Sequence, residues 1–143
     1  MGAWALLALA LDRVSKVVVA RSILPGESVP VWQGVFHLTH VRNPGAAFGL
    51  LPGWDGLLVV LPAAVALAAV WLVPALVGQH PVAPLAVGLI VGGALGNLVD
   101  RVTTGLVTDF LDFRVWPVFN LADTFIVAGA GLLLLSLLRR GAD

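Results

Sequence analysis

The chain has 143 residues, of which 59% are hydrophobic and 11% are charged, and its mean hydropathy is +1.01. A water-soluble domain carries roughly 25% charged residues, so this composition predicts a protein with lipid as its solvent. The formal net charge is zero and there is no cysteine, which excludes the basic surface of a nucleic-acid-binding protein, disulfide bonds, thiol catalysis and cysteine-based zinc sites.

The first apolar segment, residues 2–20, is the weakest of four candidate membrane-spanning helices because it contains Asp12, Arg13 and Lys16. A cleaved signal peptide is the alternative. No Lys or Arg precedes the apolar run, and charged residues follow it where a small-residue cleavage site would be expected. We therefore interpret the segment as a retained first helix.

Three further segments are long and apolar enough to span a bilayer, which takes about 20 residues per helix. Asp100 ends the uncharged part of the second of these, and Asp123 is the one charge of the third, near its start. Four spans place both termini on one side of the membrane and both long connections on the other. The spans are residues 2–20, 57–77, 82–103 and 119–138, and the long connections are residues 21–56 and 104–118.

Charge counting leaves the orientation open. Arg139 and Arg140, just after the last span, favour a cytoplasmic C-terminus. The other side carries Arg21, Arg42, Arg101 and Arg114.

The first long connection contains a predicted strand. Residues 34–41 alternate in the way that a half-buried strand does, and Asn43-Pro44-Gly45 is typical of a turn. Since an open sheet edge cannot lie in hydrocarbon, we expect a small sheet at the membrane surface.

Four carboxylates gather where the third and fourth spans meet the second long connection: Asp100, Asp109, Asp112 and Asp123. On one continuous helix Asp109 and Asp123 would be about 21 Å apart, but Trp116-Pro117 breaks a helix between them. Asp109 is then expected at the exit of the third span and Asp123 at the start of the fourth. A hairpin could bring them together, and two adjacent carboxylates hold one proton between them. This is the arrangement of an aspartic peptidase, which requires no metal and no cofactor.

Simpler interpretations exist for several of these groups. Asp123 could be a helix N-terminal carboxylate favoured by the dipole. Asp12 and Lys16, one turn apart, could form a self-neutralised ion pair, which we prefer to a role in positioning the active-site loops. Asp100 competes with Asp109 for the catalytic role, but it precedes Arg101, and a carboxylate beside a guanidinium tends to stay ionised. We interpret Asp100 as structural.

The third span also carries a stripe of glycines at Gly88, Gly92 and Gly96, which suits close helix packing. Asn97 and Arg101 lie on the adjacent stripe, and each needs a polar partner at that depth.

Five patches, in this order and at span ends, together resemble the lipoprotein signal peptidase (signal peptidase II) family, over essentially the whole chain. They are Asp12-x-x-x-Lys16, Asn43-Pro44-Gly45-Ala46-Ala47-Phe48-Gly49, Gly92-Gly93-x-x-Gly96-Asn97-x-x-Asp100-Arg101, Gly105-x-Val107-x-Asp109-Phe110 and Phe119-Asn120-x-Ala122-Asp123.

The resemblance implies a single membrane α-helical domain, residues 1–143, with four transmembrane helices, a small extracytoplasmic β-sheet and a second periplasmic loop. It implies an enzyme of the bacterial inner membrane with both termini cytoplasmic and its active site on the extracytoplasmic face. The enzyme would be a monomer that removes signal peptides from diacylglyceryl-modified prolipoproteins, just before the lipidated cysteine. The glycine stripe of the third span and neighbouring apolar residues would give the diacylglyceryl tail a groove. Globomycin-type antibiotics would inhibit the enzyme. By position, Asp109 and Asp123 would be catalytic; Asn43, Gly45, Asn97, Arg101 and Asn120 would line the substrate site; and Asp12, Lys16 and Asp100 would support it.

Two other classes of protein fit parts of the pattern. A proton-coupled transporter also uses intramembrane carboxylates, but it should distribute them through the bilayer, whereas here they gather at one face. A non-catalytic scaffold could pack through the glycine stripe. It would not need three asparagines and two such aspartates on one side.

Overall fold

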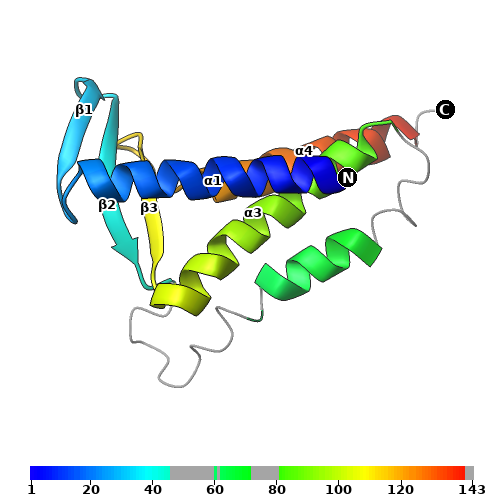
Figure 1. Cartoon of the computed structure of the whole chain (residues 1–143). Coiled ribbons are helices and arrows are strands. Elements are labelled where there is room, and N and C mark those ends of the chain that lie inside the picture. The colour runs from blue at the N-terminus through cyan, green and yellow to red at the C-terminus, as the bar shows by residue number, and fades with distance from the viewer. Residues whose placement is uncertain (46–59, 61, 72–80, 141–143) are drawn as a thin grey trace.

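In the computed structural model, which describes residues 1–45, 60, 62–71 and 81–140, long helices converge on a small sheet at one end (Figure 1). The ends of α1 and α4 farthest from the sheet both lie on the side of the molecule away from it, and α4 extends beyond the start of α1 (Figure 1). The chain order of the named elements is α1 Gly2–Ser22, β1 Ser28–Trp32, β2 Phe36–Asn43, α3 Ala83–Thr104, β3 Val107–Asp112 and α4 Leu121–Arg140.

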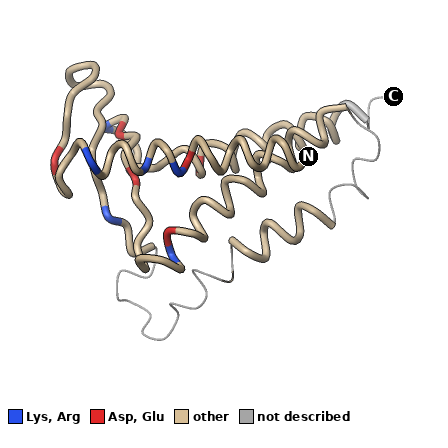
Figure 2. Tube along the Cα trace, in the orientation of Figure 1, with Lys and Arg blue, Asp and Glu red and all other residues tan. Residues whose placement is uncertain are grey.

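Helices α1, α3 and α4 each begin and end within two residues of the predicted spans 2–20, 82–103 and 119–138. Two of the described helices, Ala83–Thr104 and Leu121–Leu138, are long and apolar enough to cross a membrane. Pro62–Trp71 is a shorter apolar helix; the rest of the predicted span 57–77 lies outside the described residues. Charged residues gather towards the sheet (Figure 2). Between Asp123 and Arg139, α4 carries no charged residue.

The glycines of α3 permit its close approach to the helices on both sides. A Cβ on Gly92 would overlap the carbonyl oxygen of Ala5 and lie 2.7 Å from the Cβ of Ala8, both on α1. A Cβ on Gly93 would overlap the carbonyl oxygen of Ala122 at the start of α4. The predicted packing role of the glycines is confirmed. The predicted lipid groove over them is wrong, because α1 occupies that face.

The sheet is antiparallel in the order β1-β2-β3. The predicted strand within residues 34–41 is β2, which continues as far as Asn43. The third strand was not predicted: β3 pairs with β2, with Val41 opposite Asp109. Asp109 therefore lies on a strand of the sheet, and its predicted place at the exit of the third span is wrong.

A turn at Gly105 redirects the chain from α3 into β3. Gly105 has φ +74°, and its N–H donates to the carbonyl oxygen of Arg101 at 3.1 Å. A left-handed residue after the last turn commonly ends a helix, and glycine adopts that conformation without strain. The strand that carries Asp109 consequently runs back over the ends of α1 and α3.

An apolar cluster fixes the sheet against α1. Val19 and Ile23, near the end of α1, pack with Phe110 of β3, and all three side chains are buried. Phe110 and Asp109 point to opposite faces because successive strand residues alternate. Burial of Phe110 against the helix thus directs Asp109 to the face on which α4 begins.

Candidate active site

Two asparagines join the two aspartates that were predicted to pair. Asn120 donates its side-chain amide to Oδ1 of Asp109 at 2.6 Å and to Oδ1 of Asn97 at 3.1 Å. Asn97 in turn donates to Oδ1 of Asp123 at 2.8 Å. Carboxylates from a strand and from a helix therefore belong to one hydrogen-bonded group, as the hairpin prediction required.

Asp123 also caps its helix. The N–H of Asp123 donates to the side-chain oxygen of Asn120 at 3.0 Å, and Oδ2 of Asp123 accepts the N–H of Asn120 at 3.2 Å. This reciprocal pair is the capping-box geometry, which satisfies two N–H groups that have no partner within the helix. The alternative interpretation of Asp123 as a helix-terminal carboxylate is therefore correct for one oxygen, while the other oxygen faces Asn97.

Asn43 holds the second oxygen of Asp109. Its side-chain amide donates to Oδ2 of Asp109 at 2.7 Å, and its own oxygen accepts the N–H of Gly45 at 2.7 Å. Gly45 has φ +92°, so the predicted turn begins here. Residues 46–49 of the same motif lie outside the described residues.

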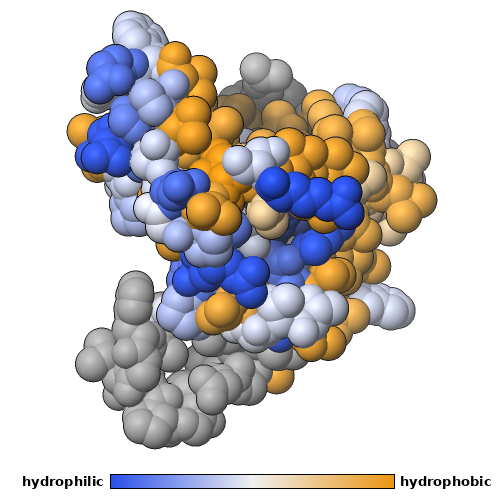
Figure 3. All heavy atoms as spheres, turned by 60° about the vertical axis from the view of Figure 1, so that its left-hand side comes forward, coloured by the Kyte–Doolittle hydropathy of each residue, from blue (hydrophilic) through white to orange (hydrophobic). Residues whose placement is uncertain are grey.

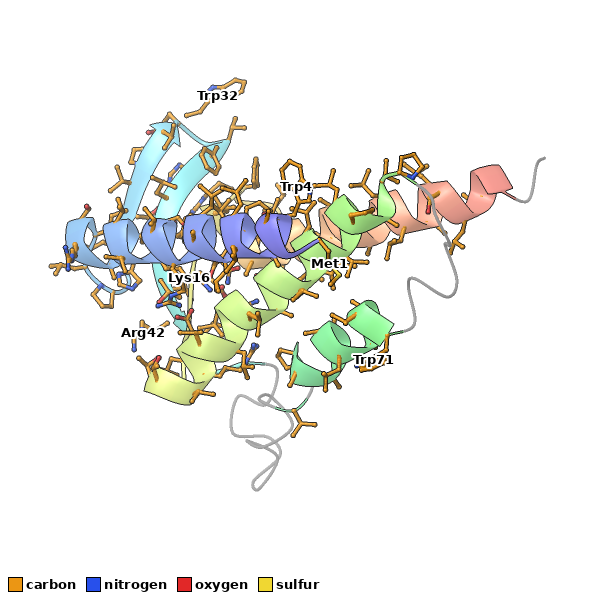
Figure 4. The ribbon with its side chains drawn as sticks, turned by 45° about the vertical axis from the view of Figure 1, so that its right-hand side comes forward. Met1, Trp4, Lys16, Trp32, Arg42 and Trp71 are labelled. Atoms are coloured by element: carbon orange, nitrogen blue, oxygen red, sulfur yellow. The ribbon has the colours of Figure 1, made fainter. Side chains whose placement is uncertain are left out.

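Lys16 links the first helix to the asparagines. Its ammonium, on a side chain only 2% exposed, donates to Oδ1 of Asn97 at 2.9 Å and lies 2.9 Å from carboxylate oxygens of both Asp12 and Asp100. The three donors of a lysine thus face three acceptors. Figure 4 shows Lys16 on α1, on the side of that helix facing α3. The predicted Asp12–Lys16 ion pair is confirmed, but Lys16 also contacts Asn97 and Asp100, so the two charges do not form an isolated pair.

Asp12 and Asp100 each reach a backbone N–H near the aspartates. Asp12 accepts the N–H of Ala122, next to Asp123, at 3.0 Å. Asp100 accepts the N–H of Thr108, next to Asp109, at 3.2 Å, and it forms an ion pair with Arg13. These contacts support the positioning role that was predicted as the second choice for Asp12 and Lys16.

Arg13 was not predicted as a site residue, and the partner predicted for Asp100 was wrong. Asp100 pairs with Arg13 and Lys16 of α1 and not with Arg101. The signal for Arg13 was present, since a third charge in an apolar span also needs a partner. Arg101 differs from Arg13 because its Nη1 is buried and donates to no acceptor among the described residues.

The surroundings of Asp109 favour its protonated form. The pKa of Asp109 is raised to about 6, first by burial and then by the charge of Asp123, against the lowering effect of the hydrogen bonds from Asn43 and Asn120. Asp112, farther along the same strand, behaves differently. Hydrogen bonds from Thr39 and Arg114 hold the pKa of Asp112 below its usual range.

A groove of about 550 Å³ opens beside Asp123. Its aromatic wall comes from the segment between β3 and α4, where Phe113 stacks on Phe119 with ring centroids 6.0 Å apart. Figure 3 shows this end of the molecule, where hydrophilic residues lie between apolar surfaces. The groove is lined by Phe113, Trp116 and Phe119 on one side and by Asp123, Thr124, Val127 and Ala128 of α4 on the other.

A carboxyl group whose pKa is raised to about 6, a second carboxylate in the same hydrogen-bonded group and an adjoining apolar groove suit acid–base hydrolysis of a substrate with an apolar part. Apolar helices that end at such a site define a membrane enzyme, and the comparisons agree. A solved structure described as a bacterial membrane enzyme is 32% identical, with a TM-score of 0.85, and the match covers 94% of this chain and 90% of that one.

The chain belongs to the signal peptidase II family, whose members cleave the signal peptides of prolipoproteins; the family model matches residues 4–139. It is 48% identical to the lipoprotein signal peptidase of Halothermothrix orenii over 132 residues, 92% of this chain and 90% of the relative. It is 50% identical to that of Moorella thermoacetica over 137 residues, 94% of this chain and 89% of the relative. These findings confirm the predicted peptidase class, and the transporter and scaffold interpretations are set aside.

Proposed function

We propose that Asp109 and Asp123 are the catalytic pair of this peptidase. The observation that carries the proposal is the Asn97–Asn120 amide bridge, which holds one oxygen of each carboxylate. The pair would hold one proton, and the burial of Asp109 favours Asp109 as its site. The ionised partner would take a proton from water as the water attacks the scissile carbonyl. The protonated partner would donate to that carbonyl and then to the leaving amine.

The substrate would be a prolipoprotein whose cysteine carries a diacylglyceryl group, cut just before that cysteine. Asn43, Gly45, Asn97, Arg101 and Asn120 would line its path. Arg101 has the clearest reason to meet substrate. One of its buried N–H groups has no acceptor among the described residues, which is costly, and a peptide carbonyl would satisfy it. Asp12, Lys16 and Asp100 would hold the two halves of the site in register, with no metal or cofactor taking part.

The membrane arrangement would be four spans of one domain, residues 1–143, in the bacterial inner membrane, with both termini cytoplasmic and the site outside. The position of the sheet, opposite the free ends of α1 and α4, supports this topology. The first span holds three charges, and Asp12, Arg13 and Lys16 all have partners on α3 or α4, which lowers the cost of inserting them.

A single copy of the chain supplies every group used above, so the enzyme would work as a monomer surrounded by lipid. Globomycin-type antibiotics would compete with the prolipoprotein for the groove and the aspartate pair. Competition would appear as a rise in KM with kcat unchanged.

The test is cleavage of a diacylglyceryl-modified prolipoprotein in nanodiscs, followed by gel shift. Asp109→Asn and Asp123→Asn should each abolish cleavage. Asp112→Asn is the matched control: the same substitution on the same strand as Asp109, at a carboxylate that is bonded to Thr39 and Arg114 and not to the asparagines. Asp100→Asn should keep part of the activity. A folded wild-type enzyme that leaves lipidated substrate intact, or an Asp109→Asn variant as active as Asp112→Asn, would overturn the assignment.

A further inference from the structure

The backbone directly before each proposed catalytic aspartate is held by a buried carboxylate. The N–H of Ala122, which precedes the aspartate of α4, donates to Oδ1 of Asp12 at 3.0 Å. The N–H of Thr108, which precedes the aspartate of β3, donates to Oδ2 of Asp100 at 3.2 Å. Helix α1 therefore positions one aspartate through Asp12, and helix α3 positions the other through Asp100.

Lys16 contacts both of these carboxylates but holds Asp100 at one oxygen only. Its ammonium lies 2.9 Å from an oxygen of Asp12 and 2.9 Å from Oδ2 of Asp100, and it also donates to Asn97. Its three N–H groups are thus engaged, and none of them reaches Oδ1 of Asp100. The last torsion of an aspartate side chain has a broad range. A second contact is needed to keep the carboxylate from turning away from the N–H of Thr108.

Arg13 supplies that second contact. Its Nη1 forms an ion pair with Oδ1 of Asp100. The carboxylate is then held at both oxygens, by Arg13 at Oδ1 and by Lys16 and the N–H of Thr108 at Oδ2. The side chain of Arg13 is 32% exposed, whereas that of Asp100 is 6% exposed. Hydrogen bonds between charged groups are stronger away from water, so this contact fixes the orientation of Asp100.

Strand β3 depends on such contacts because it lies at an edge of the sheet. On the side away from β2, the carbonyl oxygen of Phe119 accepts the N–H of Phe110 at 2.9 Å, and Asp100 accepts the N–H of Thr108. Asp109 lies between these two contacts. Release of the first contact would free the start of the strand on that side, and Asp109 would shift relative to the asparagines that hold it.

We infer that Arg13 is a positioning residue of this peptidase, which acts through Asp100 to hold the start of β3 and so the carboxyl group of Asp109. The inference rests on the proposed catalytic role of Asp109. Arg13 itself contacts neither catalytic aspartate and does not line the groove. Its loss should therefore lower kcat and leave KM unchanged, as expected when only the reacting geometry is disturbed.

Arg13→Met removes the charge and the donors but keeps much of the length of the side chain. In nanodiscs with lipidated prolipoprotein, its kcat should fall about tenfold per folded enzyme, because the reacting group is displaced. Arg13→Lys keeps the charge and should recover part of that loss. Arg21→Met is the matched control, since Arg21 is exposed on the same helix and has no ion-pair partner among the described residues. It should keep the wild-type kcat.

The possible failures can be told apart. An unchanged kcat in Arg13→Met would overturn the role of Arg13 and leave the catalytic pair standing. Full cleavage by Asp109→Asn would overturn both. Thermal unfolding in detergent gives the amount of folded enzyme in each variant.

The pH profile separates displacement of Asp109 from simple loss of folded protein. Hydrogen bonds from Asn43 and Asn120 and the charge of Lys16 lower the pKa of Asp109, while burial and the charge of Asp123 raise it. If Asp109 moves away from Asn120, its pKa should rise, so the basic limb of kcat/KM should move to higher pH in Arg13→Met. Loss of folded protein lowers the rate equally at every pH. A limb at the wild-type position would overturn the inference.

A double-variant cycle tests whether Arg13 acts through Asp100. Asp100→Asn removes the charge with which Arg13 pairs. Adding Arg13→Met to Asp100→Asn should then change kcat by less than about twofold, whereas two independent residues would multiply their effects. A further loss of about tenfold in the double variant would mean that Arg13 acts on another group, and it would overturn the inference.

Discussion

The side chain of Asn120 donates to Oδ1 of Asp109 at 2.6 Å while its oxygen accepts the N–H of Asp123 at the start of α4. One side chain therefore serves as a helix cap and as the link between strand and helix. Because the cap places Asp123 and the amide places Asp109, folding of the last helix and assembly of the aspartate pair are the same event.

Replacing Asn120 by serine should separate these two roles. Serine caps helices as well as asparagine does, so the thermal midpoint should fall by only a few degrees. Serine lacks the amide that reaches Asp109, so kcat/KM should fall about 100-fold, as it does when a preorganised donor is lost. Unfolding in detergent and the cleavage assay measure the two effects. If kcat/KM of Asn120→Ser falls only as much as the loss of folded enzyme explains, Asn120 is a helix cap and has no separate role at Asp109.

The pH profile of kcat/KM should have a basic limb at about pH 6, where the free enzyme loses the proton favoured on Asp109. The hydrogen bond from Asn43 stabilises the ionised form and lowers the pKa of Asp109. Asn43→Ala removes that bond, so the pKa should rise and the limb should move to higher pH. A limb that stays in place, or moves to lower pH, would contradict this role of Asn43.

Much of this site was predictable because its residues are unusual in an apolar chain. Carboxylates and asparagines are rare in apolar spans, and their positions in the sequence drew attention to the two aspartates, Asn97 and Asn120. Asn43 became a candidate site residue only through the resemblance to the signal peptidase II family. Strand β3 was not predictable in the same way. Both of its faces are largely buried, so it lacks the alternation that reveals a strand, and pairing with the distant β2 stabilises it.

The ion-pair partners of the buried charges could not be predicted from neighbouring residues in the sequence either. The adjacency of Asp100 and Arg101 suggested a pair, but successive helical residues do not face each other. Asp100 faces α1, where Arg13 and Lys16 lie 87 and 84 positions earlier (100 − 13 and 100 − 16). Only the packing of α1 on the glycines of α3 brings these groups together.

Lys16→Met should destabilise the fold because it leaves Asp12 and Asp100 without the ammonium between them. Breaking a buried pair costs about 3–5 kcal/mol. Arg21→Met, at an exposed position of the same helix, is the control and should change stability by less than about 0.5 kcal/mol. Denaturant unfolding in mixed micelles gives both values. Similar losses in the two variants would mean that the buried network adds no stability.

Gly92→Ala tests whether the approach of α1 to α3 also positions the site. A Cβ at Gly92 would overlap α1 at Ala5 and Ala8, and such overpacking costs about 1–3 kcal/mol. To relieve the overlap, α1 should move away from α3 and draw Lys16 away from Asn97. The Gly92→Ala variant should therefore have a lower kcat as well as a lower stability. Gly131→Ala is the matched control on α4, where no described residue lies within 4 Å of an added Cβ, and alanine there should stabilise the helix by up to about 1 kcal/mol. Thermal unfolding and cleavage rates are compared for both variants. If Gly92→Ala loses stability but keeps the wild-type kcat, the close packing supports the fold alone, and Lys16 does not transmit the position of α1 to the aspartates.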